Sequence, residues 1–479
     1  MLRKTLFIIG LLALFLLAGI PTPAEAATFD VTNATQLQTV LATAASNDED
    51  DTINLAAGTY QAPVGSFVYA PSTAAKSNHS LALIGSGASS TILTGNNLRR
   101  VLFIDSIDNA GNPSLTIRLE GMTIRDGKIT APTELAGGAY IQTKDISIDV
   151  RDCIFTNNHA DTTNSIAGAA YFSSFPGLGH VRLINNVVYQ NSAADFAGGF
   201  YISVANGPAR LINNTIYDNS VSTGVQNAGV FIDSTGNLLN SFDLVNNIIF
   251  NNHSNDGVSR DIYIDVDPVL YTILLSHNTF GLNPEAFVCV GCTNLSESGN
   301  ILQNPLLVDP ANGDFHLSAE SPCIEKGVSV TLLPVFDIER DPRVIGASPD
   351  IGADEFSACG DGFINDNAGE FCDDGDATAG DGCSASCQVE AGYTCSGTPS
   401  ICQSTCGDGI LDAGEECDDG NTSNNDDCVE GCKMAKCTDG FLQAGFEQCD
   451  DGNTNDNDGC HNNCTDSDDD SGGCSLIRM

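Results

Sequence analysis

Basic residues are scarce in this chain of 479 residues, where 19 lysines and arginines stand against 62 aspartates and glutamates. The formal net charge at pH 7 is −43. Binding to nucleic acid depends on clustered lysine and arginine side chains that neutralise phosphates, so this composition argues against a nucleic-acid partner. It favours a soluble protein in salty surroundings, or a protein that collects cations.

Long apolar runs are absent beyond the first 20 residues. The single run, Leu6–Ile20, follows a basic N-terminus and precedes an Ala-Glu-Ala sequence at 24–26. A basic start, a short apolar stretch and a small-residue cleavage site are typical of a secretory signal peptide, which we assign to residues 1–26. The alternative is an uncleaved N-terminal anchor, although the run is short for a membrane span. We therefore expect an exported protein that begins near Ala27.

Cysteine is rare in the first three quarters of the chain and dense in the last quarter. Of 19 cysteines, only four precede Cys359, namely Cys153, Cys289, Cys292 and Cys323. The last quarter also carries 27 acidic and three basic residues. In an exported chain, this density of cysteine indicates disulfides formed in an oxidising compartment. A zinc cluster, the intracellular alternative, would require paired cysteines or histidines, and the tail offers only His461.

The middle of the chain repeats one short signature. Its clearest copies are Asn185–Asn191, Asn213–Asn219 and Asn246–Asn252, which begin with Asn-Asn and continue with β-branched or aromatic residues. Aligning Asp152, Asn186, Asn214, Asn247 and Asn278 gives spacings of 34, 28, 33 and 31 residues. Glycines at 137, 168, 198 and 229 keep step with the signature, and no helical period intervenes. Such units cannot bury an apolar face alone, so the pattern predicts coils of β-strands stacked on one another.

Equivalent asparagines in stacked coils lie about one strand spacing apart, ~4.8 Å, where their amides can hydrogen-bond in a ladder. We place Asn157, Asn191, Asn219, Asn252 and Asn283 in one register and interpret them as structural. A row of sugar-binding asparagines is the alternative. An amphipathic helix at 35–45 is expected to cap the first coil, which we assign to residues 51–60.

These coils resemble the pectin-lyase-like right-handed β-helix superfamily, and in particular surface proteins of the polymorphic outer-membrane type. The matching motifs are Phe-Thr-Asn-Asn at 155–158 and Gly-Gly-Phe-Tyr-Ile at 198–202. Residues 304–324 resemble the last coil of bacterial β-helix proteins with variable C-terminal anchors, and Asp350–Phe356 resembles the segment that closes that domain. The resemblance implies an all-β fold, a right-handed parallel β-helix over residues 27–356.

The enzymes of that superfamily carry catalytic segments that this chain mostly lacks. The resemblance implies Asn-Thr-Asp, Asp-Asp, Gly-His-Gly and Arg-Ile-Lys segments for a hydrolase, and only Gly179–Val181 partly matches one of them. A lyase needs a base beside a uronate, and Arg182, Arg210 and Asp243 fall in equivalent positions of neighbouring coils. The competing interpretation is a surface row of ordinary ion pairs. Three further aspartates, Asp261, Asp265 and Asp267, alternate with apolar residues as on a half-exposed strand. We assign no catalytic residue.

Three copies of a small cysteine module follow at residues 359–402, 406–432 and 437–464. Each copy has a Cys-x-Asp-Gly start and a Cys-Asp-Asp-Gly-Asx segment. The module cysteines are Cys359, Cys372, Cys383, Cys387, Cys395, Cys402, Cys406, Cys417, Cys428, Cys432, Cys437, Cys449, Cys460 and Cys464. The pattern resembles the myxococcal-type cysteine-rich repeat, which is related to Notch-like modules of animal surface proteases, and Thr438 in place of glycine departs from it. Modules this small lack a core, so disulfides must hold them, and four cysteines leave three pairings open.

The acidic turns of these modules suggest calcium, the one cofactor that the sequence indicates. Hard cations take roughly six to eight oxygens, and a glycine-kinked loop lets carboxylates and carbonyls converge. The candidate ligands are Asp373, Asp374, Asp376, Asp381, Asp418, Asp419, Asn421, Asp426, Asp450, Asp451, Asn453 and Asp458. The alternative is a set of solvated turns whose aspartates accept hydrogen bonds from main-chain amides. The order of residues excludes an EF-hand.

The final segment, 465–479, is acidic and contains Gly-Gly-Cys at 472–474. It looks like the start of a bacterial C-terminal sorting signal, and we expect membrane attachment only through such an anchor. The sequence as a whole predicts an exported bacterial protein, secreted or at the cell surface, that acts in adhesion or binds a polysaccharide, a surface glycan or another surface protein. The second hypothesis is a polysaccharide lyase or glycoside hydrolase acting along the β-helix groove, and the third is a passive stalk.

Overall fold

The computed structural model describes residues 26–465 with short gaps. The gaps are residues 74, 107–111, 130, 132–133, 163–164, 176, 223–228, 235, 237, 239, 259, 268–270, 282–284, 361, 365–369, 391–392, 405–406, 412–414, 430–431 and 456–459. The expected signal peptide, the final acidic segment after Thr465, Asn283, Cys406 and Asp458 therefore lie outside the described residues. The chain divides into two compact units, one ending at Phe356 and the other beginning at Ser357.

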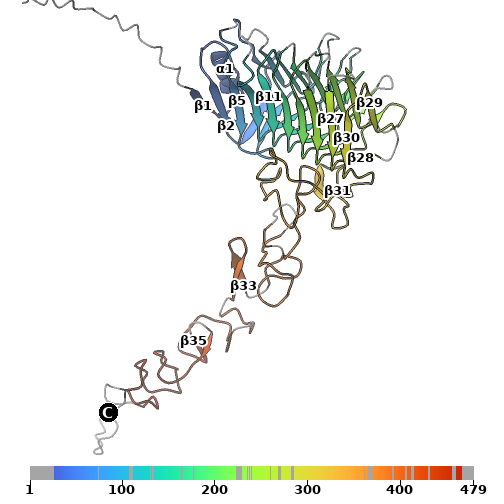
Figure 1. Ribbon diagram of the computed structural model, residues 1–479. Coiled ribbons are helices and arrows are strands. Elements are labelled where there is room, and N and C mark those ends of the chain that lie inside the picture. The colour runs from blue at the N-terminus through green and yellow to red at the C-terminus, as the bar shows by residue number, and fades with distance from the viewer. Residues whose placement is uncertain are drawn as a thin grey trace, which may run out of the picture. The chain divides into compact units, whose positions relative to one another are not determined.

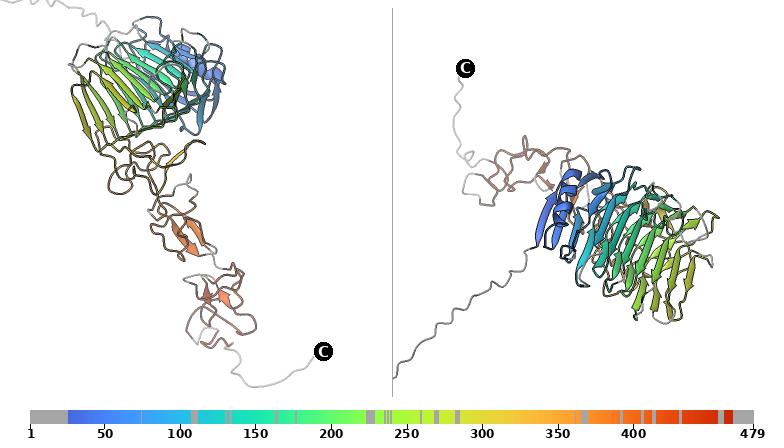
Figure 2. Two further views of the ribbon diagram at one scale, coloured as in Figure 1. Left: turned by 90° about the vertical axis from the view of Figure 1, so that its right-hand side faces the viewer. Right: turned by 90° about the horizontal axis from the view of Figure 1, so that it is seen from above.

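The first unit is a parallel β-solenoid, as the repeats predict (Figure 1). One coil runs through β10 (Ala139–Thr143), β11 (Ser147–Arg151), β12 (Ile154–Thr156) and β13 (His159–Ala160) before β14 (Ala170–Ser174) begins the next coil. Each strand pairs in parallel with its counterparts in the coils before and after it, for example Tyr140 with Tyr171. The views in Figure 2 show the coils following one another in chain order.

The stacked strands form four parallel sheets. Sheet 1 consists of β1 (Ala27–Val31), β2 (Asp51–Leu55), β5 (Leu81–Gly85), β8 (Thr116–Glu120), β11, β15 (Val181–Ile184), β19 (Ala209–Ile212), β23 (Asn240–Val245), β27 (Tyr271–Ser276) and β30 (Leu295–Ser298). Sheet 2 consists of β4 (Phe67–Tyr69), β7 (Leu102–Ser106), β10, β14, β18 (Phe200–Val204), β22 (Val230–Ser234), β26 (Ile262–Val266) and β29 (Phe287–Val290). Sheet 3 consists of β3 (Gly58–Gln61), β6 (Thr91–Thr94), β9 (Thr123–Arg125), β12, β16 (Val187–Tyr189), β20 (Thr215–Tyr217), β24 (Ile248–Phe250) and β28 (Thr279–Phe280). Sheet 4 consists of β13, β17 (Ser192–Ala193), β21 (Ser220–Val221) and β25 (His253–Ser254).

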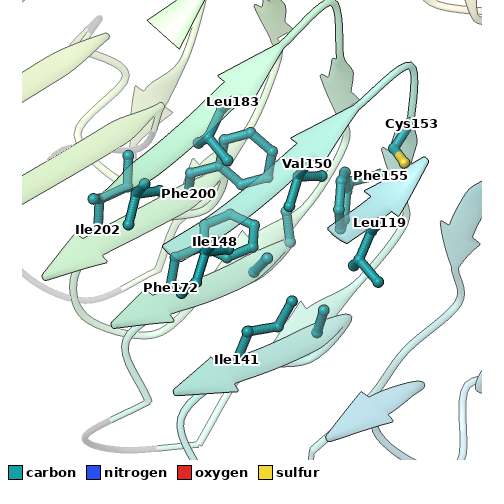
Figure 3. Packing of buried hydrophobic residues seen from close by; sticks show 14 of the residues in the cluster. Leu119, Ile141, Ile148, Val150, Cys153, Phe155, Phe172, Leu183, Phe200 and Ile202 are labelled. Carbon is teal, nitrogen blue, oxygen red and sulfur yellow. The ribbon is translucent and has the colours of Figure 1, made fainter. Parts of the chain in front are cut away.

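The core lies inside the coils, where alternate side chains of each strand point inward. Figure 3 shows Ile148, Val150 and Leu183 of sheet 1 packing against Phe172 and Phe200 of sheet 2. These five side chains are fully buried. Burying an aliphatic or aromatic side chain contributes roughly 1.5–3 kcal/mol to the stability of the fold. Each added coil extends the same hydrophobic core and therefore adds to this stability.

The expected N-terminal cap is present as α1 (Ala34–Ala44). Asn33 caps the helix, since its Oδ1 accepts a hydrogen bond from the Gln36 amide at 3.0 Å. Leu37 and Leu41 of α1 are buried in the solenoid core. The helix therefore covers the apolar end that the first coil would otherwise expose.

Two ladders of side-chain amides run along the corners of the coils. The first is Asn186–Asn214–Asn247–Asn278–Asn300, and the second is Asn158–Asn191–Asn219–Asn252, which ends on Asp261. The ladder expected from the sequence is correct for Asn191, Asn219 and Asn252 but wrong for Asn157. Asn157 adopts a left-handed conformation with φ of 55° and donates outward to Asp126. The alignment of Asp152 with Asn186 is also wrong by one residue, because Cys153 lies opposite Asn186.

A left-handed residue precedes each ladder asparagine and turns the chain at the corner. At the first corner these residues are Asn185, Asn213, Asn246 and His277, with φ between 51° and 58°, and Asp152 makes the same turn before Cys153. Asparagine and aspartate tolerate this conformation better than other residues with a side chain. The Asn-Asn pair of the repeat thus has two roles: the first residue makes the turn and the second joins the ladder.

The segment that follows β30 does not form a last coil, contrary to the expectation from the sequence. We call residues 302–356 the strap. Its only strands, β31 (Leu307–Asp309) and β32 (Asp314–Leu317), pair antiparallel with each other. The strap packs on the outer face of sheet 3, where the Phe315 ring lies 4.8 Å from the Tyr189 ring. The Asn246 side chain anchors it further through two hydrogen bonds of 2.9 Å with the main chain of Val328.

The outward residues of sheet 3 explain why the strap lies there. The central strands read Val-Val-Tyr, Thr-Ile-Tyr and Ile-Ile-Phe, so they are apolar on both faces. An apolar outer face must be covered, and the strap supplies Phe315, Leu317, Ile351 and Ala353 for this purpose.

The second unit is held by disulfides and has only two short hairpins among its described residues. These are β33 (Tyr393–Ser396) with β34 (Ile401–Ser404), and β35 (Cys428–Val429) with β36 (Lys433–Met434). The pairs are Cys359–Cys387, Cys372–Cys383, Cys395–Cys402, Cys417–Cys428, Cys437–Cys464 and Cys449–Cys460. In the third module the outer pair encloses the inner pair, which selects one of the three pairings open to four cysteines. The first module shows the same nesting and adds the Cys395–Cys402 pair.

Candidate functional site

The outer face of sheet 1 carries a row of charged residues at one register position. Strand pairing places Arg118, Asp149, Arg182, Arg210 and Asp243 side by side in successive coils. The expected neighbours Arg182, Arg210 and Asp243 are therefore adjacent. Sequence reasoning missed Arg118 and Asp149, although the alternation in Thr-Ile-Arg-Leu-Glu and Ser-Ile-Asp-Val-Arg marks both side chains as outward.

The charges along this row are unevenly paired. Arg210 Nε lies 2.9 Å from Asp243 Oδ2, and the guanidinium of Arg151 holds the carboxylate of Asp149. Arg182 makes no ion pair with any described residue, and its Nε atom is shielded from solvent without a hydrogen-bond partner there. Partial burial, reinforced by Arg210 and Arg151, lowers the pKa of Arg182 despite the opposing charge of Asp149. Directly opposed like charges destabilise a sheet, and the repulsion between Arg182 and Arg210 is only partly offset by Asp149 and Asp243.

His180 lies beside this pair without adding to its charge. Partial burial and the charge of Arg182 lower the pKa of His180 to about 4. Its Nδ1 atom lies 3.1 Å from the hydroxyl of Ser147 in the preceding coil. The imidazole is therefore neutral at neutral pH and able to donate or accept a hydrogen bond. Gly179–Val181, the partial match to a catalytic segment, thus lies next to the arginine row.

A cavity of about 290 Å³ lies where this face meets the strap. Arg118, Arg151 and Arg340 line it together with Glu120, Asp152 and strap residues 331–336. Three guanidinium groups around one hollow are unusual in a chain with only 19 basic residues. The hollow and the row share Arg118, which pairs with Glu120, and together they carry five arginines against four carboxylates. We call this region the arginine face.

The outer face of sheet 2 offers a contrasting row of aromatic side chains. Phe103, Tyr140, Tyr171, Tyr201, Phe231 and Tyr263 stack with ring centroids 4.9–5.5 Å apart. Each ring covers the face of its neighbour, so only ring edges and hydroxyls point outward. The stack stabilises the coils by about 0.5–1.5 kcal/mol per pair, but its inner rings offer no face to a sugar.

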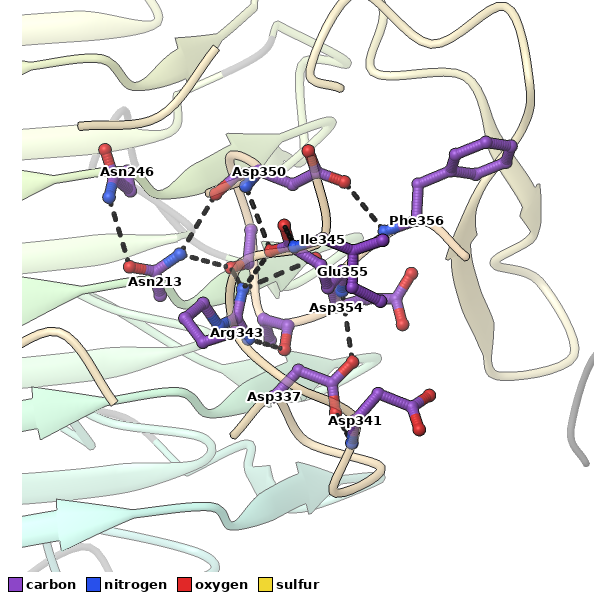
Figure 4. Close-up of polar contacts among 12 residues, drawn as sticks. Asn213, Asn246, Asp337, Asp341, Arg343, Ile345, Asp350, Asp354, Glu355 and Phe356 are labelled. Atoms are coloured by element: carbon purple, nitrogen blue, oxygen red, sulfur yellow. Dashed lines mark hydrogen bonds and ion pairs between the residues drawn. The ribbon is translucent and has the colours of Figure 1, made fainter. Parts of the chain in front are cut away.

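The strap contains a buried group of carboxylates around one arginine (Figure 4). Arg343 Nη1 lies 3.5 Å from Glu355 Oε2, and Nη2 donates to Asn185 Oδ1 at 2.7 Å. Burial and the nearby charge of Asp350 raise the pKa of Glu355 to about 8. Burial also raises the pKa of Asp350 to about 6, because one guanidinium cannot offset every carboxylate around it.

The first aspartate of each module turn caps main-chain amides. Asp418 accepts hydrogen bonds of 2.7–3.2 Å from the amides of Gly407, Asp408, Gly409 and Gly420, and Asp450 accepts the equivalent set in the third module. Desolvation alone would raise the pKa of both carboxyls, but these donors lower it. Asp373 accepts three such bonds in the first module. The carboxylate oxygens of these three aspartates are therefore already occupied by hydrogen bonds from main-chain amides.

A second set of acids converges beside each of the first two turns. One carboxylate oxygen each from Asp374, Asp376 and Asp381 lies within 4.8 Å of the other two. In the second module the Asn421 amide donates to Asp419 Oδ1 at 3.0 Å and to Asp426 Oδ2 at 3.1 Å. Asp451 and Asn453 occupy the same positions in the third module, where Asp458 is outside the described residues. The structure thus separates the candidate calcium ligands into capping and converging groups.

The three aspartates near residue 265 do not behave as one half-exposed group. Asp265 and Asp267 are exposed, as the alternation predicts. Asp261 is fully buried, and its Oδ1 accepts hydrogen bonds of 3.0 Å from the main-chain and side-chain nitrogens of Asn252. Asp261 therefore ends the second amide ladder, and the expectation of a half-exposed side chain is wrong for it.

Comparison with known proteins gives a match to one family model and a short stretch of similarity to curated proteins. Residues 386–433 and 434–465 match the model of a domain of unknown function, DUF4215. A stretch of 54 residues, 11% of the chain, is 44% identical to pappalysin-1 of Homo sapiens and of Mus musculus. This stretch covers 3% of the length of either relative. No helix in the described part of the chain is long and apolar enough to cross a membrane.

Proposed function

We propose that this protein is an extracellular binding protein whose arginine face holds an anionic polysaccharide. The disulfide-rich unit points to an extracellular or secreted location. The combination of a parallel β-solenoid and a cysteine-rich unit in one chain fits a surface or extracellular protein. The arginines of the face favour an anionic ligand. The regular repeat of the coils favours an extended ligand, such as a polysaccharide chain.

The observation that carries this proposal is the unpaired Arg182 next to Arg210. A chain with a net charge of −43 has ample carboxylates to neutralise both groups, yet only Arg210 has a carboxylate partner among the described residues. Carboxylate or sulfate groups of a glycan would relieve the repulsion and accept charge-assisted hydrogen bonds. The neutral His180 would add a hydrogen bond to a sugar hydroxyl. Coils spaced at ~4.8 Å suit a polymer with regularly repeated anionic groups.

Calorimetry with polygalacturonate, alginate and neutral dextran would test this function. We expect binding to the two uronates, weakening as salt rises, and none to dextran. Arg182→Gln should reduce uronate affinity about tenfold or more, because a hydrogen bond to a charged group is worth about 1.5–3 kcal/mol. Arg125→Gln is the matched control, since Arg125 is exposed on sheet 3 and already lies 3.4 Å from Asp126. Equal loss in both variants would contradict the assignment of the arginine face.

Assaying the same polysaccharides for cleavage products distinguishes binding from catalysis. A lyase would release unsaturated uronate ends and a hydrolase would release new reducing ends. Steady turnover that Arg182→Gln or a substitution of His180 abolishes would replace binding with polysaccharide cleavage as the function of this face. Binding without product supports the proposal as stated.

Calcium binding by the cysteine modules is a second proposed function. It is supported by the convergence of Asp374, Asp376 and Asp381 and by the related grouping around Asn421. Burial and the charges of Asp381 and Asp376 raise the pKa of Asp374, and a divalent cation would relieve this repulsion. The ion would stiffen turns that disulfides already hold.

A further inference from the structure

A histidine and two carboxylates from three separate stretches of the strap meet at one point. His316 comes from β32, Glu339 from the loop after Asp337, and Asp354 from the closing segment. One potential ligand atom from each lies within 4.8 Å of the other two. None of these three residues belongs to the arginine face or to the module turns.

The ring of His316 is held in one orientation. Its Nδ1 atom lies 2.6 Å from Asp314 Oδ1, and when the ring is neutral a proton on Nδ1 would leave Nε2 free to bind a metal ion. The Nε2 atom is shielded from solvent and has no hydrogen-bond partner among the described residues. A buried polar atom without a partner is costly, at about 1–3 kcal/mol, and rare in native proteins. The orphaned nitrogen therefore points to a ligand.

One carboxylate oxygen of Glu339 lies within 4.8 Å of one of Asp354, so the two groups repel each other when both are ionised. Asp354 is only 5% exposed, and its Oδ2 accepts a hydrogen bond from the Leu317 amide at 3.2 Å. The guanidinium of Arg343 pairs with Glu355 and reaches Asp354 only through its main-chain carbonyl. A cation between Glu339 and Asp354 would offset their repulsion.

We propose that His316, Glu339 and Asp354 bind one divalent transition-metal ion, with Zn²⁺ the best match, and that Asp314 is the positioning residue for His316. Imidazole and carboxylate ligands suit Zn²⁺, Mn²⁺ and Co²⁺, whereas Ca²⁺ prefers oxygen ligands alone. A carboxylate that accepts the second ring N–H is the usual support of a metal-bound histidine. The ion would join β32 to the closing segment and so fasten the strap over sheet 3.

The test uses the full chain, stripped with a chelator and then supplied with excess Ca²⁺ to fill oxygen-only sites in the modules. Co²⁺ titration followed by its visible absorption, and Zn²⁺ calorimetry, should each report one tight site per chain. His316→Gln should abolish that site. Asp314→Asn should weaken it about 10–100-fold, the usual effect of losing the group that orients a metal-bound histidine. His253→Gln is the matched control, because His253 is half-buried on β25, outside the strap, and lies 3.6 Å from Asp218.

Glu339→Gln keeps the test decisive if the histidine variant fails to fold, because Glu339 lies in an exposed stretch of the strap. Its circular dichroism should match the parent chain, while Zn²⁺ and Co²⁺ affinity falls at least tenfold. Unchanged affinity in Glu339→Gln, or in a folded His316→Gln, would overturn the proposal. Absence of any tight Zn²⁺, Mn²⁺ or Co²⁺ site in the parent chain would overturn it as well.

Discussion

The side-chain amide of Asn219 donates a hydrogen bond to Oδ1 of Asn252, one coil further along the solenoid, at 2.8 Å. The same nitrogen donates to the carbonyl of Val188 in the preceding coil at 3.0 Å. One buried amide therefore ties three successive coils together. The ladder satisfies the main chain at a corner where sheet hydrogen bonds are interrupted.

Asn219→Leu should destabilise the solenoid by about 1–3 kcal/mol, because it removes these bonds and leaves the amides of Asn191 without their acceptor. Thermal unfolding followed by circular dichroism measures this change. Asn54→Leu is the control, since Asn54 makes one exposed hydrogen bond to Asp30 on an outer strand position. A midpoint for Asn219→Leu equal to that of the control would mean that the ladder contributes nothing to stability.

The carboxylates around Arg343 should make the solenoid less stable as pH rises. The pKa values of Asp350 and Glu355 are raised in the folded protein, to about 6 and about 8, so folding takes up protons. Their favourable contribution is complete below the unfolded pKa values near 4 and is lost as pH rises through the folded values. If the two carboxyls titrate independently, these values imply that the free energy of unfolding falls by up to ~5 kcal/mol between pH 5 and pH 8.

Glu355→Gln should flatten this pH dependence, whereas Glu320→Gln, at an exposed position of the strap, should leave it intact. Denaturant unfolding at several pH values, with a chelator present, gives the comparison. A slope that Glu355→Gln leaves unchanged would show that this carboxyl does not titrate between pH 5 and pH 8.

Reduction should unfold the cysteine modules and spare the solenoid. Each module is held by closed loops that contribute ~3 kcal/mol apiece in the chain-entropy model, and little apolar surface remains without them. Cys153 of the solenoid and Cys323 of the strap are free thiols, and burial raises the pKa of both. Alkylation after mild reduction, read by peptide mass spectrometry, should label the module cysteines but neither of these two. Labelling of Cys153 at the same rate would mean that the solenoid opens with the modules.

Calcium should bind the oxidised modules through the converging acids. Asp381→Asn should remove one calcium per chain in calorimetry, and Asp48→Asn, at an exposed position before β2, should not. Binding should weaken as pH falls, because protons compete for the carboxylates, and Asp374 should respond first since its pKa is raised. If calorimetry at ~1 mM calcium gives only the heat of dilution while the disulfides are intact, the acidic turns do not bind calcium and only cap main-chain amides.

The repeats in the sequence predicted the parallel β-solenoid, its helical cap and the cysteine-rich unit. These features depend on periodicity and composition, which are visible along the chain. The register of the amide ladder was predicted one residue off at Asn157, because adjacent asparagines in the pair have opposite roles. Only the left-handed conformation of Asn157 distinguishes the turning residue from the ladder residue.

The tertiary structure alone decided where distant residues meet. The sequence of residues 304–324 predicted a further coil at the end of the stack. The strap packs instead along the apolar outer face of sheet 3, because that face must be covered. That path places His316 beside Asp354, and the stacking of the coils places Arg118 and Asp149 in line with Arg182. Local patterns specify which side of a strand each residue faces, but packing against other coils determines its neighbours and hence its charge environment.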